Sequence, residues 1–231
     1  MSLASVGGNF GSVGAPKVYA SLSQNQEVLD SISYSSLPGL SVGQTVKYTL
    51  GLNNGVYVHT DTLTKVFGNP ITLLYDPGTS TLTNFTSSGG TWGISNTKFT
   101  SPPGSITDSP SGDYSINQNK NITTSASITL TNAIYAHMQY YTRFALEKNY
   151  DYSQILISTN NGVSWSQLCG KYETAPVSFG GTDPVYDGIQ DGFVKEEFDL
   201  SSYIGQSVRF RFQFFSDGGV NKDGFYFDDL W

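Results

Sequence analysis

The residues of this chain best suited to chemistry are two carboxylates close to its end. Asp228 and Asp229 are adjacent in the stretch from Gly224 to Trp231, which otherwise reads as an apolar strand. A carboxylate inside a strand is costly to bury unless it has a partner. Calcium is a common partner, because it accepts oxygen ligands in flexible number. The pair therefore indicates a cation site.

Other acidic residues lie in loops and have a simpler interpretation. Asp113, Asp217 and Asp223 each lie next to a glycine or close to one, and an aspartate in a turn often bonds its own backbone. The spacing from Asp217 to Asp223 does not match an EF-hand loop. These three residues are expected to form turns.

The constellations typical of enzymes are absent from the sequence. His59 and His137 are isolated, and no His-Glu-x-x-His motif, Gly-x-Ser-x-Gly elbow or Walker loop occurs. Glu147 and Asp151 have the residue types of a glycosidase acid and base. They lie in one loop beside Lys148, however, where a solvated turn is the simpler reading. We expect no catalysis by this chain.

Aromatic residues give a second functional hypothesis. Trp92, Trp165, Tyr140, Tyr141 and Tyr186 are the candidates for a platform on which a sugar ring stacks. The alternative is that these rings fill the core. The sequence alone leaves both readings open.

Composition limits the classes of partner. The chain has 231 residues, a formal net charge of −7 and 13% charged residues, about half the usual share. An acidic chain lacks the basic footprint that nucleic acid requires. No run approaches the roughly 18 apolar residues of a membrane helix, and the single Cys169 has no second cysteine for an internal disulfide.

The two ends predict that this is a piece of a longer, exported protein. Met1 to Gly8 lacks the basic and apolar regions of a signal peptide, and the chain stops within an apolar strand pattern at Trp231. We expect an export signal upstream and a secreted or cell-surface location.

Alternating patterns predict an all-β fold. Val208, Phe210, Phe212 and Phe214 alternate with Arg209, Arg211 and Gln213, as in a strand with one buried face. The dipeptide Asn161-Gly162 predicts a tight hairpin turn with positive φ. Further strands are expected at 126–130, 133–146, 152–159 and 163–168, and no segment shows a capped helical period.

The first third of the chain predicts a separate small domain. Short strands are expected at 17–22, 45–52, 56–60 and 62–67, and the run Gly68-Asn69-Pro70 then breaks the pattern. We expect a linker over 1–15, an Ig-like β-sandwich over 16–69, and a larger β-sandwich over 70–231.

Several stretches of the larger domain together resemble a MAM-like jelly-roll module of secreted bacterial peptidases, including immune-inhibitor-A-type metallopeptidases and zinc carboxypeptidases. They are Ser101 to Tyr114, Asn149 to Tyr152, Ser158 to Trp165, Asp199 to Gln206 and Asp223 to Leu230. Two more, Cys169 to Tyr172 and Pro184 to Gly188, resemble the variant found in carboxypeptidases of the Bacteroidetes type.

The resemblance implies a two-sheet, galactose-binding-like jelly roll with a structural calcium ion near the junction of its first and last strands. Carried over to this sequence, the ligands are Asp108 from an early loop and Asp228 or Asp229 from the last strand, with Asp76 in the place of a further acidic residue. MAM domains of eukaryotes carry disulfides, which a chain with one cysteine lacks.

The resemblance also implies a function. We expect a non-catalytic accessory region of a secreted bacterial hydrolase, a zinc carboxypeptidase, that stabilises the enzyme or binds substrate or a surface. Its partners would be the parent catalytic domain and a protein or polysaccharide substrate. The alternative is a carbohydrate-binding module, because a jelly roll does not by itself fix a function.

Overall fold

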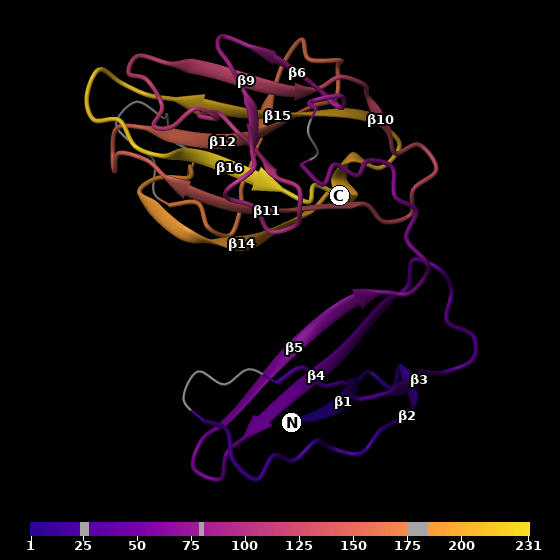
Figure 1. Ribbon diagram of the computed structural model, residues 1–231. Coiled ribbons are helices and arrows are strands. Elements are labelled where there is room, and N and C mark those ends of the chain that lie inside the picture. Colours follow the sequence, from indigo (N-terminus) through magenta and orange to yellow (C-terminus); the bar gives the residue numbers. More distant parts are fainter. Residues whose placement is uncertain (24–27, 79–80, 175–183) are drawn as a thin grey trace. The chain divides into compact units, whose positions relative to one another are not determined.

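A computed structural model describes residues 1–23, 28–78, 81–174 and 184–231, and its regular elements are almost entirely β-strands (Figure 1). The exception is η1, a single turn of 3-10 helix at Ser201–Tyr203. Within these residues no helix has the length and apolar character needed to cross a membrane. The all-β prediction is confirmed. The chain divides into two compact units, Met1–Pro70 and Ile71–Trp231.

The first unit contains two small antiparallel sheets. One has the strand order β1-β4-β5 and the other pairs β2 with β3. The strands are β1 (Ser2–Val6), β2 (Phe10–Val13), β3 (Tyr34–Ser36), β4 (Thr45–Asn53) and β5 (Val58–Val66).

Several local expectations for this unit differ from the structure. Residues 1–15, expected as a linker, contain β1 and β2, and no strand forms over 17–22. The two strands expected at 56–60 and 62–67 are one strand, β5. The reason for the first difference is a long-range pairing of β1 with β4, in which Ser2 lies opposite Gly51. The Ig-like topology stays a prediction.

The second unit is a β-sandwich of two antiparallel sheets (Figure 1). The five-stranded sheet has the order β14-β11-β16-β8-β7: β14 (Ile189–Asp199), β11 (His137–Ala145), β16 (Gly224–Asp228), β8 (Ser105–Thr107) and β7 (Gly93–Ser95). The six-stranded sheet has the order β13-β12-β15-β9-β6, with β10 on β15: β13 (Ser166–Leu168), β12 (Tyr152–Ser158), β15 (Ser207–Phe215), β9 (Asn119–Thr124), β6 (Phe85–Ser88) and β10 (Ile128–Thr129).

The core between these sheets is aromatic, as the alternation in β15 predicts. Phe212 and Phe214 are fully buried, while Arg209 and Arg211 lie on the outer face of β15 and are only partly buried. The ring of Phe212 stacks on that of Phe227 from the facing sheet, with the centroids 3.9 Å apart. Aromatic packing of this kind therefore joins the two layers.

Two connections fix the ends of strands in this unit. In the β12–β13 hairpin, Asn161 and Gly162 have φ values of 60° and 89°, which confirms the predicted positive φ. The pair nearest the turn is Ile157 with Ser166, so the connection is longer than the predicted tight turn and the return strand is shorter than 163–168. The second connection is an isolated antiparallel bridge between Asp76 and Leu230. This bridge holds the start of the second unit beside its last residues.

Candidate functional site

The adjacent carboxylates at the end of β16 are bound by protein donors. Asp228 Oδ2 accepts hydrogen bonds from the backbone N–H groups of Thr100 (2.7 Å) and Ser101 (2.9 Å), and its Oδ1 accepts one from Asp229 N–H (2.8 Å). Burial raises the pKa of Asp228, and these N–H donors oppose that rise. Asp229 Oδ2 accepts from the Ser101 hydroxyl at 2.6 Å. The pair thereby fastens the loop at Thr100 and Ser101 to the last strand.

Asp76 is also buried and supplied with donors. Its Oδ1 accepts from the backbone N–H of Gly78 (3.0 Å) and its Oδ2 from the side-chain amide of Asn84 (2.9 Å). Its backbone pairs with Leu230 in both directions, each at 2.9 Å. Asp76 thus closes a turn and holds the chain end.

Asp108 directly follows β8 and lies beside the start of β16, in a different environment. Its Oδ1 accepts from Phe225 N–H at 2.8 Å, and its Oδ2 is 3.7 Å from the ammonium of Lys120, which donates to the Asp108 carbonyl at 2.9 Å. Burial raises the pKa of the Asp108 carboxyl to about 7, although Phe225 N–H and Lys120 act in the opposite direction.

The four predicted ligands do not form one site. Asp108 bonds Phe225, three residues before Asp228, and three residues of strand span about 10 Å. A cation beside Asp108 would be repelled by Lys120, and the oxygens of Asp228 already face backbone donors. The residues therefore do not fit a calcium ion held by all four, and calcium binding stays a prediction.

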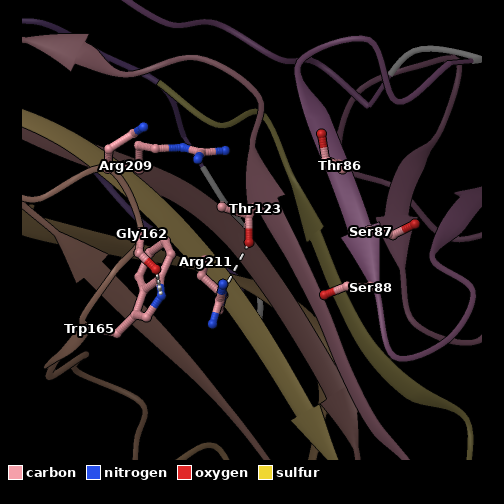
Figure 2. A pocket seen from close by; sticks show the side chains of 9 residues that line it. Thr86, Ser87, Ser88, Thr123, Gly162, Trp165, Arg209 and Arg211 are labelled. Atoms are coloured by element: carbon pink, nitrogen blue, oxygen red, sulfur yellow. Dashed lines mark hydrogen bonds between the residues drawn. The ribbon is translucent and has the colours of Figure 1, made fainter.

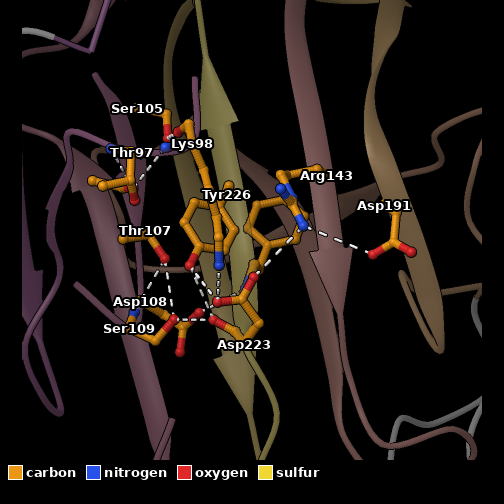
Figure 3. A network of polar contacts seen from close by, with 12 residues as sticks. Thr97, Lys98, Ser105, Thr107, Asp108, Ser109, Arg143, Asp191, Asp223 and Tyr226 are labelled. Carbon is orange, nitrogen blue, oxygen red and sulfur yellow. Dashed lines mark hydrogen bonds and ion pairs between the residues drawn. The ribbon is translucent and has the colours of Figure 1, made fainter. Parts of the chain in front are cut away.

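A network of polar contacts covers the outer face of the five-stranded sheet (Figure 3). Asp223 pairs with Lys98 and, at 3.6 Å, with Arg143, which also lies 3.8 Å from Asp191. The hydroxyl of Tyr226 donates to Asp223 at 2.8 Å. The charges within this network are matched, as is expected of a structural surface.

The residues considered as an acid and a base belong to a carboxylate trio. One oxygen each from Glu147, Asp151 and Asp217 lie within 4.8 Å of one another. Asp151 is buried and accepts from the hydroxyl of Tyr114 (2.6 Å) and from Asp217 N–H (2.8 Å), and burial raises its pKa. These contacts join two loops. Because Asp151 is buried, the predicted solvated turn is wrong for this residue.

The aromatic residues considered for a sugar platform are mostly in the core. Trp92, Tyr140 and Tyr186 are 3%, 0% and 0% exposed, so they cannot receive a ligand ring. Trp165 and Tyr141 are only partly buried. Of the five, Trp165 is the residue that lines a described pocket.

Sequence reasoning missed two buried carboxylates, Asp187 and Glu196. Glu196, in β14, has the larger set of partners. It is fully buried and accepts from the backbone N–H groups of Lys171 and Tyr172, each at 2.8 Å, and from the Tyr186 hydroxyl at 3.2 Å. Its partners lie in two other segments, one at Lys171 and Tyr172 and the other at Tyr186. Only the alternation along β14, where the opposite face is exposed, could have pointed to Glu196.

The pocket at Trp165 is a shallow polar groove on the outer face of the six-stranded sheet, with a cavity volume of about 210 Å³ (Figure 2). We call it the arginine groove. It is lined by Thr86, Ser87, Ser88, Thr123, Asn161, Gly162, Trp165, Arg209 and Arg211.

Four separate segments build the arginine groove. Arg209 and Arg211 come from β15, Thr123 from the neighbouring β9, and the serines and threonine at 86–88 from the edge strand β6. The turn after β12 adds Trp165. The alternation in β15 predicted that both arginines face outward, but nothing local in the sequence shows that they meet this tryptophan.

The second unit is a two-sheet β-sandwich. Its buried carboxylates accept hydrogen bonds from loops, and its arginine groove is polar and shallow. The immune inhibitor A-like MAM domain family matches residues 109–231. This match covers more than half of the chain. The chain belongs to that family, which confirms the resemblance drawn from the sequence.

Two relatives are peptidases by name. The chain is 36% identical to the pre-pro-metalloprotease PrtV of Vibrio cholerae over 104 residues, which are 45% of this chain and 11% of that protein. It is 29% identical to bacillopeptidase F of Bacillus subtilis over 85 residues, 37% of this chain and 5% of that protein. The shared part is thus a small fraction of each peptidase, and the chain is an accessory MAM domain region rather than a catalytic domain.

Solved structures include distant likenesses to two β-rich modules. The K2 cleaved adhesin domain of Lys-gingipain matches with a TM-score of 0.44 and 14% identity, over 68% of this chain and 96% of that one. TmCBM61, solved with β-1,4-galactotriose, matches with a TM-score of 0.47 and 11% identity, over 70% of this chain and 97% of that one.

Proposed function

We propose that this chain is the non-catalytic accessory region of a secreted bacterial peptidase, a zinc carboxypeptidase, and that it holds the enzyme on its substrate or on a cell surface. The observation that carries the proposal is the MAM family match over residues 109–231, together with a metalloprotease relative of which the matched stretch is only 11%. A small module that is shared by different larger peptidases is expected to contribute binding or stability rather than chemistry.

The test compares the full-length parent enzyme with a form that lacks residues 71–231. We expect equal kcat and KM on a small soluble peptide, because the catalytic domain is intact, and a loss of activity on insoluble substrate or on whole cells. The melting temperature of the catalytic domain, measured in both forms, separates a binding role from a stabilising one.

Two outcomes would contradict this proposal. If the shortened enzyme matches the full-length enzyme on insoluble material and in melting temperature, the module neither binds nor stabilises. If the isolated chain itself turns over a peptide or glycoside and Glu147→Gln abolishes that turnover, the chain is an enzyme.

The second candidate function is carbohydrate binding, and the arginine groove favours it. The groove offers hydroxyl groups from Thr86 and Ser88 and an indole ring from Trp165, which are groups that bind sugars. In this form of the proposal, the region is a carbohydrate-binding module attached to the same kind of enzyme.

We also propose that the folded region binds one structural calcium ion. The support is the family resemblance, in which an early loop and the last strand supply carboxylates. Because Asp108 lies beside Phe225 and Asp228 is three residues further along β16, we expect at most one of them to be a ligand of that ion. An ion bound only by the folded state would stabilise it by mass action.

A further inference from the structure

Among the residues that the structure describes, the two arginines of the groove have no acidic partner. Arg209 Nε donates to the backbone carbonyl of Thr124 at 2.9 Å, and its Nη2 donates to the same oxygen, which leaves Nη1 and the second hydrogen of Nη2 for a ligand. Arg211 Nε donates to the hydroxyl of Thr123 at 3.1 Å. Within the described residues, neither guanidinium lies within ion-pair distance of a carboxylate. The third arginine of the chain, Arg143, has two such partners.

This lack of partners is unusual for an acidic chain. The sequence has 19 acidic residues against 12 Lys and Arg, yet Arg209 and Arg211 stand two residues apart on the same face of β15. Burial and the charge of Arg209 lower the pKa of Arg211, although a guanidinium stays charged at neutral pH. A bound anion would relieve this repulsion between like charges.

Trp165 holds one of the guanidiniums in a fixed orientation. The guanidinium carbon of Arg211 lies 4.0 Å from the centroid of the indole ring, and the indole N–H donates to the Gly162 carbonyl at 3.1 Å (Figure 2). A guanidinium stacked in this way keeps its remaining N–H groups free to bind a planar carboxylate in a bidentate manner.

The rest of the groove matches a ligand rich in hydroxyl groups. Thr86 and Ser88 are exposed on the edge strand β6, on the same sheet face as Thr123, and Asn161 adds an amide. No aliphatic side chain lines the described groove, so an apolar peptide residue finds no pocket. Its volume of about 210 Å³ is below the usual size of a small-molecule cleft, which suits part of an extended chain.

We propose that the arginine groove binds the carboxylate groups of an acidic polysaccharide, a chain that contains uronic acid residues. Arg209 and Arg211 bind the carboxylate, Trp165 orients Arg211, and the hydroxyl groups of β6 and β9 bind the sugar. This inference rests on the binding role proposed above and gives that role a ligand class and a site.

Isothermal titration of the whole chain with tetragalacturonate tests the proposal, with a neutral galactose tetrasaccharide and tetraglutamate as comparison ligands. We expect binding of tetragalacturonate that weakens with added salt and falls at least tenfold in both Arg209→Gln and Arg211→Gln. Arg211→Lys keeps the charge but loses the planar fork and should also bind more weakly. The control is Lys195→Gln, which removes one positive charge from β14 of the other sheet.

Melting curves of each variant show that a loss of binding is not a loss of folding. The inference would be overturned if Arg209→Gln and Arg211→Gln bound tetragalacturonate as tightly as the unmodified chain does, or if the unmodified chain did not bind it. Equal or tighter binding of tetraglutamate would replace the polysaccharide by an acidic peptide. Binding of the neutral sugar that ignores both arginines would reject the groove and leave the proposed accessory role standing, since the parent-enzyme comparison tests that role separately.

Discussion

At the scale of single residues, the carboxylates of the second unit differ in what compensates their charge. Asp228 receives three backbone N–H groups, whereas Asp108 receives one and lies 3.7 Å from an ammonium group. Its second oxygen has no hydrogen-bond partner within the described structure. Asp108 is therefore the carboxylate whose ionisation most clearly lowers the stability of the folded state.

This difference predicts a pH dependence of stability. The pKa of Asp108 is raised from 3.8 to about 7, so between about pH 4 and pH 7 the folded state keeps a proton that the unfolded state has lost. Stability then falls as the pH rises through this window. We expect the free energy of unfolding, measured with urea, to fall less between about pH 4 and pH 7 in Asp108→Asn than in the unmodified chain.

The matched control is Asp113→Asn, which removes one carboxylate at an exposed position. It should leave the slope between pH 4 and pH 7 as it is. If Asp108→Asn and Asp113→Asn have the same slope as the unmodified chain, Asp108 is already ionised in the folded state at low pH.

At the scale of elements, β16 is the strand on which the second unit depends. It lies inside the five-stranded sheet, between β11 and β8, and all five of its residues are buried. Its first residue, Gly224, has a φ of +100°, which a residue with a Cβ adopts only with strain.

Gly224→Ala should destabilise the fold strongly. An added Cβ would lie 2.2 Å from Ser109 Oγ and 2.6 Å from Asp108 Oδ1, so a steric clash adds to the backbone strain. We expect a loss of more than about 2 kcal/mol in the free energy of unfolding, measured with urea.

Gly205→Ala is the control for backbone strain alone. Gly205 has a similar φ of +88°, and nothing lies within 4 Å of an added Cβ. It should cost only about 1 kcal/mol, the backbone share of the effect. Equal losses in the two variants would mean that crowding at Gly224 is relieved.

How far the sequence predicts these elements depends on whether the signal is local. The alternation in β15 and the positive φ at Asn161 and Gly162 are local signals, and both were predicted correctly, whereas the length of that connection was not. The strand β1 was missed because its five residues are followed by Gly7 and Gly8, which read as a linker, and because only pairing with β4 makes it a strand.

The same limit applies to the candidate sites. Each acidic residue was recognised from its type, but whether Asp108 meets Asp228 depends on the register between β8 and β16. The arginine groove combines residues from 86 to 211. No spacing rule brings such positions together, so the groove emerges only from the folded sheet.

At the scale of the whole molecule, the remaining question is whether a bound ion stabilises the fold. If calcium binds only the folded state, a concentration 100 times its Kd adds about 2.7 kcal/mol. We expect the melting temperature to fall on addition of a strong chelator and to recover with calcium.

Two variants locate the ion. Because Asp108 lies beside Phe225, three residues and about 10 Å before Asp228 along β16, we do not expect Asp108→Asn and Asp228→Asn to remove ligands of the same ion. Only one of the two should blunt the recovery with calcium. A melting temperature that ignores the chelator would reject calcium altogether.

The bridge between Asp76 and Leu230 has a consequence for how the sandwich is attached to other segments. Strands paired in this way lie about 5 Å apart, so a chain that leads into the unit at Asp76 is beside Leu230 when the unit is complete. The sandwich therefore begins and ends at neighbouring positions. It can be inserted into a loop of another protein without forcing that loop open, and tension applied to both ends would load this bridge and the two hydrogen bonds between Trp231 and Gln139 before it reached the aromatic core.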